Sequence, residues 1–183
     1  FSEWGDLYKR ASFDLIKFQS LSDEYLVSNL PFIRPSISFE ANNLNNKQRN
    51  RNSSIKISFN SISRKNNKDV DSIHFQTTNN KSYIFNGFLI KDFNIFNIDA
   101  YNKNGTSNNK ALIKFFPKLG LDIQYPLINI SKKYSFLIEP KVQLFISPDD
   151  YYNDKIRNED SLELDLNSSN LFNYDRYSGN DRK

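Results

Sequence analysis

Two stretches decide the fold: Lys118–Leu127, with the sequence KLGLDIQYPL, and Phe136–Ile146, with the sequence FLIEPKVQLFI. In both, apolar side chains occupy every second position and polar side chains fall between them, which is the two-residue period of a β-strand. A short polar turn, Asn129–Lys133, separates the two stretches. The sequence therefore predicts an antiparallel hairpin with one apolar face and one polar face.

The two faces of this hairpin differ in chemistry. The apolar row consists of Leu119, Leu121, Ile123, Ile138, Val142 and Leu144, and the polar row consists of Asp122, Gln124, Glu139, Lys141 and Gln143. Such alternation fits a soluble sandwich with its apolar face inside, and it also fits a membrane barrel with lipid outside and a hydrated lumen. Ionic residues in the middle of strands favour the barrel, as do tyrosines near strand ends, at Tyr8, Tyr25, Tyr101, Tyr125 and Tyr134.

Working outward, further strands are predicted where the same period recurs. They are expected at Tyr8–Gln19, Tyr25–Leu30, residues 36–40, residues 55–60 and Val70–Thr77. The stretch Lys81–Tyr101 fits either one long strand or a hairpin that turns near Lys91-Asp92. Clusters of Asn, Lys, Ser and Asp predict solvated loops at Asn42–Asn52, Lys65–Asp69 and Asn102–Lys110.

Four prolines bear on these strands because proline cannot donate a ladder hydrogen bond. Pro117 and Pro126 are predicted to terminate their strand. Pro35 and Pro140 lie inside alternating runs, so a bulge or locally frayed pairing is expected at each.

The composition excludes several classes of protein. The 183 residues include 16 Phe and 10 Tyr but no Cys, which removes disulfide scaffolds, thiol nucleophiles and cysteine metal sites. No run of about 18 apolar residues occurs, so no membrane-spanning helix is expected. The chain begins at Phe1 without Met and ends in a charged tripeptide, which indicates a segment of a longer protein.

Charge is unevenly distributed along the chain. Residues 149–183 contain nine acidic and five basic residues, a formal charge of −4, which leaves +8 for residues 1–148. The basic residues are scattered singly along strands and in Asn-rich turns, without a recognised RNA- or DNA-binding motif. We therefore expect no nucleic-acid partner.

Residues that could support catalysis are few. His74 is the one histidine, no Gly-x-Ser-x-Gly sequence occurs, and no glycine-rich phosphate loop is present. The acidic pairs Asp149-Asp150 and Glu159-Asp160 fit turns and loops better than a glycosidase site. We expect His74 to be an ordinary strand residue, and we expect no enzyme activity, no metal site and no cofactor.

The last 35 residues differ from the rest of the chain. Their arginines alternate with carboxylates and aromatic residues, and Gly179 permits a turn closed to other residues, so an ordered loop is favoured over a mobile one. Its predicted structural residues are Arg157, Glu159, Asp160, Asn170, Phe172, Arg176, Gly179, Asp181 and Arg182.

Several motifs in order resemble one family. They are Glu139–Gln143, Ser147-Pro148, Asn158–Ser161, Asn170–Phe172 and Arg176–Arg182, with weaker likeness at Phe18–Leu21, Leu30–Ile37 and Pro117–Pro126. Together they resemble the LptD family, the outer-membrane proteins that assemble lipopolysaccharide. Residues 53–78 lack the arginine and glycine pattern associated with that family, and no lateral-gate residue corresponds to a position in this chain.

The resemblance implies an all-β fold, in which antiparallel strands form part of a large transmembrane β-barrel and a long ordered loop follows at the C-terminal end. Residues 1–148 are then a barrel wall of eight or nine strands, and residues 149–183 are the loop. The implied partners are lipopolysaccharide, the outer-membrane lipoprotein plug LptE and the periplasmic bridge protein LptA, in the cell outer membrane. The alternatives are another outer-membrane barrel, a porin or receptor, or a soluble β-sandwich binding module.

Overall fold

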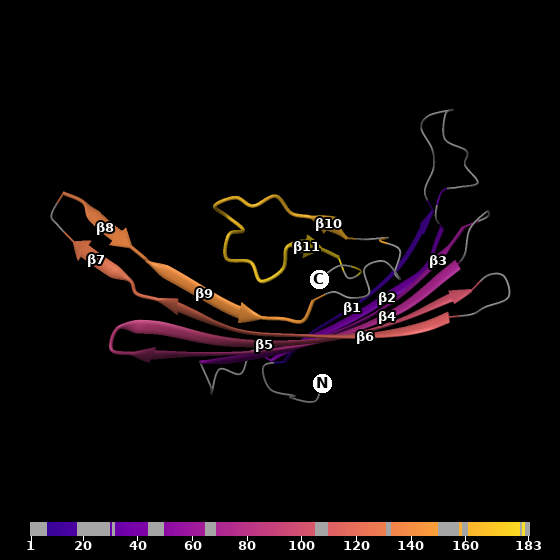
Figure 1. The fold of residues 1–183 in the computed structure, drawn as a ribbon, viewed down its shortest axis with the longest axis horizontal. Coiled ribbons are helices and arrows are strands. Elements are labelled where there is room, and N and C mark those ends of the chain that lie inside the picture. Colours follow the sequence, from indigo (N-terminus) through magenta and orange to yellow (C-terminus); the bar gives the residue numbers. More distant parts are fainter. Residues whose placement is uncertain are drawn as a thin grey trace, which may run out of the picture. The chain divides into compact units, whose positions relative to one another are not determined.

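The computed structural model describes residues 7–17, 30, 32–43, 50–64, 69–104, 110–130, 133–149, 158, 161–179 and 181 (Figure 1). The strands in this part of the chain are β1 (Leu7–Lys17), β2 (Phe32–Asn43), β3 (Arg51–Ser63), β4 (Asp69–Phe85), β5 (Phe88–Asn104), β6 (Lys110–Gln124), β7 (Leu127–Ile130), β8 (Ser135–Ile138), β9 (Lys141–Ile146), β10 (Leu162–Glu163) and β11 (Tyr177–Ser178). Within these ranges, no helix is long and apolar enough to cross a membrane. The predicted all-β class is confirmed.

Most strands belong to one sheet with the order β1-β2-β3-β4-β5-β6-β9. Neighbours in this order follow each other along the chain except at β6 and β9, because the intervening β7 and β8 pair with each other. A separate two-stranded sheet contains β10 and β11. Of the predicted strands, Tyr25–Leu30 lies outside the described residues apart from Leu30, which is not in a strand.

The predicted C-terminal hairpin is present, with its two faces as expected. Leu121 pairs with Leu144 and Asp122 pairs with Gln143, so apolar residues oppose apolar ones and polar residues oppose polar ones. The predicted turn began at Asn129, but this residue belongs to β7, so the turn begins later in the chain. The pairing of Leu127 with Ile138 continues the same register as that of Gln124 with Lys141.

Strand geometry is interrupted midway along this hairpin, where two prolines nearly face each other. The Tyr125 N–H donates to the Pro140 carbonyl at 3.1 Å, but Pro140 has no N–H with which to return the bond. The break therefore separates β6 and β9 from β7 and β8 without shifting the register. Figure 1 shows β7 and β8 extending beyond the turn that joins β4 to β5.

The other strand prolines have different positions. The register between β1 and β2 shifts between the pairs Ile16 with Ile33 and Asp14 with Ser36, which confirms a bulge at Pro35. The prediction for Pro117 was wrong, because this residue lies inside β6. Backbone amides two residues apart point to the same side of a strand, so the Pro117 nitrogen faces the β9 side of β6, as the Tyr125 N–H does. The pairing of β6 with β9 ends at Leu119, so no β9 residue lies opposite Pro117. A missing N–H costs no ladder bond there.

The turn within Lys81–Tyr101 falls at Asn86-Gly87 and not near Lys91-Asp92. Both residues have positive φ, 47° for Asn86 and 83° for Gly87, as the tight two-residue hairpin turns require. The ring of Tyr125 lies close to this turn and packs on Phe88 with centroids 4.6 Å apart.

The chain divides into two compact units, and the division crosses several strands. The first contains Phe1–Leu44, Ser54–Thr77 and Asn97–Phe115. In the described parts of β4, β5 and β6 within it, exposed apolar side chains alternate with buried polar ones: Ile113 is 69% exposed, whereas its neighbour Lys114 is 1% exposed. The buried polar side chains of this unit are Ser58, Ser61, Ser72, His74, Asn97, Asp99 and Lys114.

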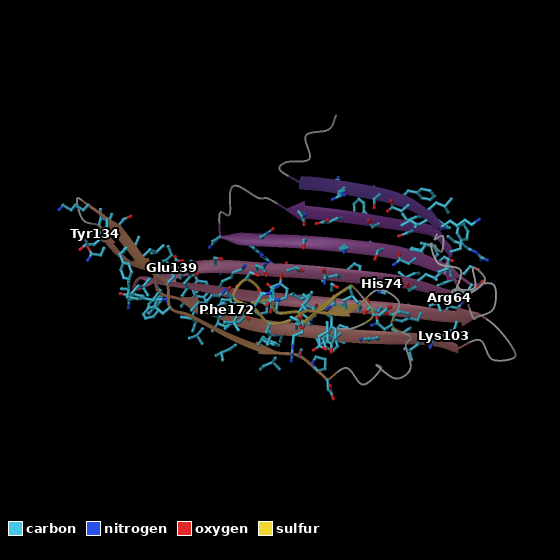
Figure 2. All side chains as sticks on the ribbon, turned by 90° about the horizontal axis from the view of Figure 1, so that it is seen from above. Arg64, His74, Lys103, Tyr134, Glu139 and Phe172 are labelled. Atoms are coloured by element: carbon cyan, nitrogen blue, oxygen red, sulfur yellow. The ribbon has the colours of Figure 1, made fainter. Side chains whose placement is uncertain are left out.

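The second unit contains Asn45–Ser53, Thr78–Phe96 and Phe116–Lys183. It has the same reversed polarity, since Leu119 is 45% exposed and the adjacent Lys118 is 3% exposed. A small apolar core of Phe93, Ile95 and Phe116 is also buried here. Figure 2 shows Tyr134 at the tip of the β7 and β8 hairpin and Glu139 where this hairpin meets β9.

We predict that Gly87→Ala destabilises the fold by about 1–2 kcal/mol, because an L-residue is strained at φ 83° and the new Cβ would lie 3.1 Å from Tyr125 Cε2. Denaturant unfolding of the full-length protein measures this. The matched control is Asn86→Gly, which tolerates the same turn and should leave the midpoint nearly unchanged. Equal effects of the two substitutions would contradict the assignment of the turn.

Candidate functional site

The candidate site lies where the C-terminal loop meets the polar face of β6 and β9. We call this region the loop–wall contact, and it comprises Phe93, Lys118, Gly120, Asp122, Lys141 and Gln143 on the sheet and Phe172, Tyr174 and Asp175 on the loop. All of these residues belong to the second unit. In Figure 1 the loop that carries β10 and β11 lies against one face of these strands.

The polar row supplies one side of this contact. Gln124 pairs with Lys141 across the two strands, and the Lys141 Nζ lies 3.5 Å from Asp122 Oδ2. The same ammonium lies 4.7 Å from the centroid of the Phe172 ring, a cation–π distance. Gln143 completes the row by donating from Nε2 to the Phe172 carbonyl at 3.0 Å. The predicted polar face of the hairpin is thus the face that the loop contacts.

Lys118 makes the strongest link between loop and sheet. Its Nζ donates to Asp175 Oδ2 at 2.9 Å and to the Tyr174 carbonyl at 3.4 Å. The Lys118 side chain is 4% exposed and that of Asp175 is 30% exposed, so the cation depends on loop atoms for its partners. Removing the partner of a buried charge destabilises a protein by more than the ion pair stabilises it, because the remaining charge is left without water and without a counter-ion.

Gly120 makes room for an aromatic contact beside this ion pair. A Cβ added at Gly120 would lie 2.0 Å from Cζ of Phe93, so no larger residue fits without moving that ring. The other neighbour of Phe93 is Tyr174 of the loop, with ring centroids 5.2 Å apart at 32°. Gly120 therefore positions Phe93, and Phe93 in turn supports Tyr174.

The loop is held in shape mainly by short-range bonds of asparagine and serine. Asn158 brackets Ser161, donating from Nδ2 to its carbonyl at 2.6 Å and accepting its N–H at 2.8 Å. Asn170 donates to the Asp165 carbonyl at 2.7 Å and accepts the Asn167 N–H at 2.8 Å. Side chains of this kind replace secondary structure in a segment that has little of it.

The residues that we predicted to structure the loop differ in their surroundings. Arg176 lies 3.6 Å from Glu163 with both side chains 62% exposed, a pair of little energetic weight. Gly179 has φ 87°, Asp181 is buried, and Asn170 and Phe172 make the contacts given above. Arg157, Glu159, Asp160 and Arg182 lie outside the described residues.

The predicted apolar row is on the opposite face. Leu119, Ile138, Val142 and Leu144 are exposed, and Leu121 and Ile123 are half-buried. Among the polar row, Glu139 is exposed and lies at the strand break between β8 and β9. Tyr101 lies near the end of β5 as predicted, but its side chain is buried against the His74 ring and is not part of an exposed aromatic girdle.

His74 lies in β4 as predicted, with partners that the sequence did not indicate. Its Nδ1 is 2.9 Å from Asp99 Oδ1 and its Nε2 is 3.0 Å from Ser72 Oγ, and all three side chains are buried. Beside it, Gln76 donates to Asn97 at 2.8 Å. These bonds join β4 to β5 and satisfy polar groups that would otherwise be buried without partners.

The chemistry available to the site is that of binding. In the described residues, no group of three or more His, Asp or Glu side chains is arranged to hold a metal ion. We did not predict Phe93, Lys118, Tyr174 and Asp175 as site residues, because they come from segments distant in the chain. Gly120, the single glycine of an otherwise alternating strand, was the one local signal of a close approach.

A comparison with protein families places the chain among known proteins. The family model described as "LptD: LPS transport system D" matches residues 7–183. The match spans both the seven-stranded sheet and the loop. No curated protein matches the chain.

We predict that Asp175→Asn releases the loop from the sheet, because Lys118 keeps its buried charge and loses its counter-ion, at a cost of about 1–3 kcal/mol. Trypsin cleavage at exposed Arg176 in the folded full-length protein should become faster. Adding Lys118→Met to Asp175→Asn removes the stranded charge and should restore part of the protection. Unchanged cleavage in the single variant would contradict the role of this ion pair.

Proposed function

Because the chain belongs to the LptD family of lipopolysaccharide transport proteins, we propose that it forms part of the outer-membrane translocon that assembles lipopolysaccharide into the outer leaflet. The family comprises outer-membrane β-barrel proteins of the Lpt pathway that bind lipopolysaccharide. The chain is an antiparallel part of such a barrel, and its seven-stranded sheet is not closed.

One observation carries the proposal: on β4, β5 and β6, exposed apolar side chains alternate with buried polar ones, among them the charged Asp99, Lys114 and Lys118. A soluble sandwich has the opposite polarity, with its apolar face inside. Lipid on the exposed face accounts for the exposed isoleucines and phenylalanines, and a hydrated lumen accounts for the polar row. We therefore assign Leu119, Leu121, Ile123, Ile138, Val142 and Leu144 to lipid.

The unpaired edges of the sheet also support a membrane barrel. In the described residues β1 and β9 each have a free edge. Unpaired backbone groups in hydrocarbon cost several kcal/mol each, so each edge requires a further strand that completes the barrel. A porin or receptor barrel would meet this requirement too, and membership of the LptD family is what favours the translocon.

On this proposal residues 1–148 are the barrel wall and residues 149–183 are a loop that lies against the lumen side of the wall. The sugars of an amphipathic glycolipid require a polar route through the membrane, and Asp122, Gln124, Glu139, Lys141 and Gln143 line such a route. The loop–wall contact narrows it, because Phe172, Tyr174 and Asp175 occupy part of the polar face.

Connection lengths favour one orientation. Asn86-Gly87 alone joins β4 to β5, whereas the long C-terminal loop follows β9 from the other end of the strands. Barrels of the outer membrane have short periplasmic turns and longer extracellular loops. We therefore place the Asn86-Gly87 turn on the periplasmic side. The plug lipoprotein LptE and the bridge protein LptA are the partners that the family implies.

We predict that Ile123→Arg destabilises the folded barrel by about 1–2 kcal/mol, because a charge on the lipid face is costly in the membrane and this cost falls toward the strand end, where Ile123 lies. Its neighbour Gln124 has a similar depth and the opposite face, so Gln124→Arg is the matched control and should have little effect. Urea unfolding of the full-length protein in lipid vesicles measures both. The reverse order of effects would contradict the assignment of the two faces.

The transport function is tested by photo-crosslinking in living cells. A photoreactive amino acid at Gln124 in the full-length protein should capture newly made lipopolysaccharide, and depletion of the periplasmic bridge should abolish that capture. The same residue at Leu144 reports on the surrounding membrane, and its crosslinks should not depend on the bridge. Absence of lipopolysaccharide at Gln124, or capture that is independent of supply, would overturn the proposal.

A further inference from the structure

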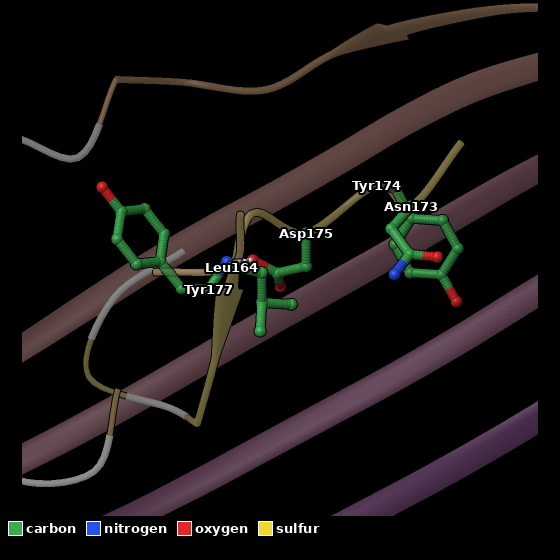
Figure 3. A pocket seen from close by; sticks show the side chains of 5 residues that line it. All are labelled: Leu164, Asn173, Tyr174, Asp175 and Tyr177. Carbon is green, nitrogen blue, oxygen red and sulfur yellow. Dashed lines mark hydrogen bonds between the residues drawn. The ribbon is translucent and has the colours of Figure 1, made fainter. Parts of the chain in front are cut away.

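A small cleft in the C-terminal loop has the chemistry of a sugar site. Its volume is about 290 Å³, and it is lined by Leu164, Asn173, Tyr174, Asp175 and Tyr177. Figure 3 shows the rings of Tyr174 and Tyr177 on opposite sides of Leu164 and Asp175. This volume is at the lower end of the range for small-molecule sites and accommodates a single sugar ring.

The polar atoms of the cleft have unused capacity. A carboxylate has about four acceptor positions. Two of those of Asp175 are occupied, one by Lys118 Nζ at 2.9 Å and one by the Tyr177 N–H at 3.3 Å. The remaining positions are available to hydroxyl donors. Among the described residues the Asn173 side chain has no hydrogen-bond partner, and it offers both a donor and an acceptor.

Charge selects the class of ligand. The lining contains one carboxylate and no cation, and Lys118 is already engaged by Asp175. A phosphate or sugar acid would be repelled by the Asp175 carboxylate, and the lining offers no cation to neutralise it. A neutral sugar has apolar C–H faces for the tyrosine rings and for Leu164, and hydroxyl groups for Asp175 and Asn173.

The cleft is also held rigid, which lowers the entropic cost of binding. Tyr174 rests on Phe93, and Tyr177 belongs to β11, where it pairs with Glu163 of β10. The Leu164 N–H donates to the Arg176 carbonyl at 2.8 Å and fixes the two sides of the cleft.

We propose that this cleft binds a neutral sugar ring of the transported glycolipid, with Tyr177 as the stacking residue and Asp175 and Asn173 as the hydroxyl partners. The proposal rests on the lumen position of the loop given under the proposed function. The cleft thereby provides a sugar-binding step along the polar route, on a loop that is anchored to the wall through Lys118.

Saturation-transfer NMR on the purified full-length protein in detergent tests the proposal, with glucose and galactose as neutral probes and inorganic phosphate and glucuronate as anionic ones. At least one neutral sugar should receive saturation, and the anions should neither bind nor compete. Tyr177→Ala should weaken sugar binding about tenfold, since stacking is lost, whereas Tyr177→Phe should retain it. The control Tyr134→Ala removes an exposed tyrosine outside the cleft and should change nothing.

A folding artefact is excluded by two measurements. First, trypsin cleavage at Arg176 must stay as slow in Tyr177→Ala as in the unaltered protein, which shows that the loop is still docked. Second, Asn173→Ala changes an exposed residue and should also weaken sugar binding. Absence of neutral-sugar binding, equal binding by Tyr177→Ala with a docked loop, or competition by phosphate would each overturn the proposal. Supply-dependent capture of lipopolysaccharide at Gln124 would persist in those cases, so failure of the cleft is distinguishable from failure of the transport function.

Discussion

In hydrocarbon an unpaired backbone N–H or C=O costs several kcal/mol, so a wall made of strands has to pair each peptide group with a neighbouring strand. The prolines of this chain show how that constraint is met. Pro35 lies at a bulge, Pro117 faces a side where β9 has ended, and Pro140 coincides with a break that keeps its register. Each proline therefore occupies a position where a missing N–H disturbs the ladder least.

In the proposed barrel, lipid on the apolar face explains why the usual distribution of polarity is reversed. With apolar side chains exposed, charged and amide groups are buried, and each needs a partner on the covered face. In the first unit strand neighbours provide partners, as Asp99 and Ser72 do for His74. In the second unit the loop does so, because Asp175 and the Tyr174 carbonyl bond to Lys118. The loop thus stabilises the part of the sheet that it contacts.

The sequence was sufficient for features that depend on local alternation. It predicted the two faces of the C-terminal hairpin and the disturbances at Pro35 and Pro140 because side chains two residues apart share a face. The turn at Asn86-Gly87 was missed although that dipeptide favours tight hairpins, since the apolar run continues on both sides of it. The loop–wall contact could not be predicted, because Lys118 and Asp175 are 57 residues apart and alternation within a strand does not indicate which distant residue a side chain contacts.

The strength of the loop–wall contact determines how often the loop leaves the sheet. It consists of the Lys118 bonds to Asp175 and to the Tyr174 carbonyl, the Gln143 bond to the Phe172 carbonyl, one aromatic stack and one cation–π contact. Such interactions contribute roughly 1 kcal/mol each. A total of a few kcal/mol leaves the undocked loop as a minor population, below about 1%. On the proposed function, a passing glycolipid can displace a loop that is held this weakly. A sugar bound in the loop's own cleft would contact Asp175, the carboxylate that holds Lys118, so sugar binding and loop docking share one residue and affect each other's free energy.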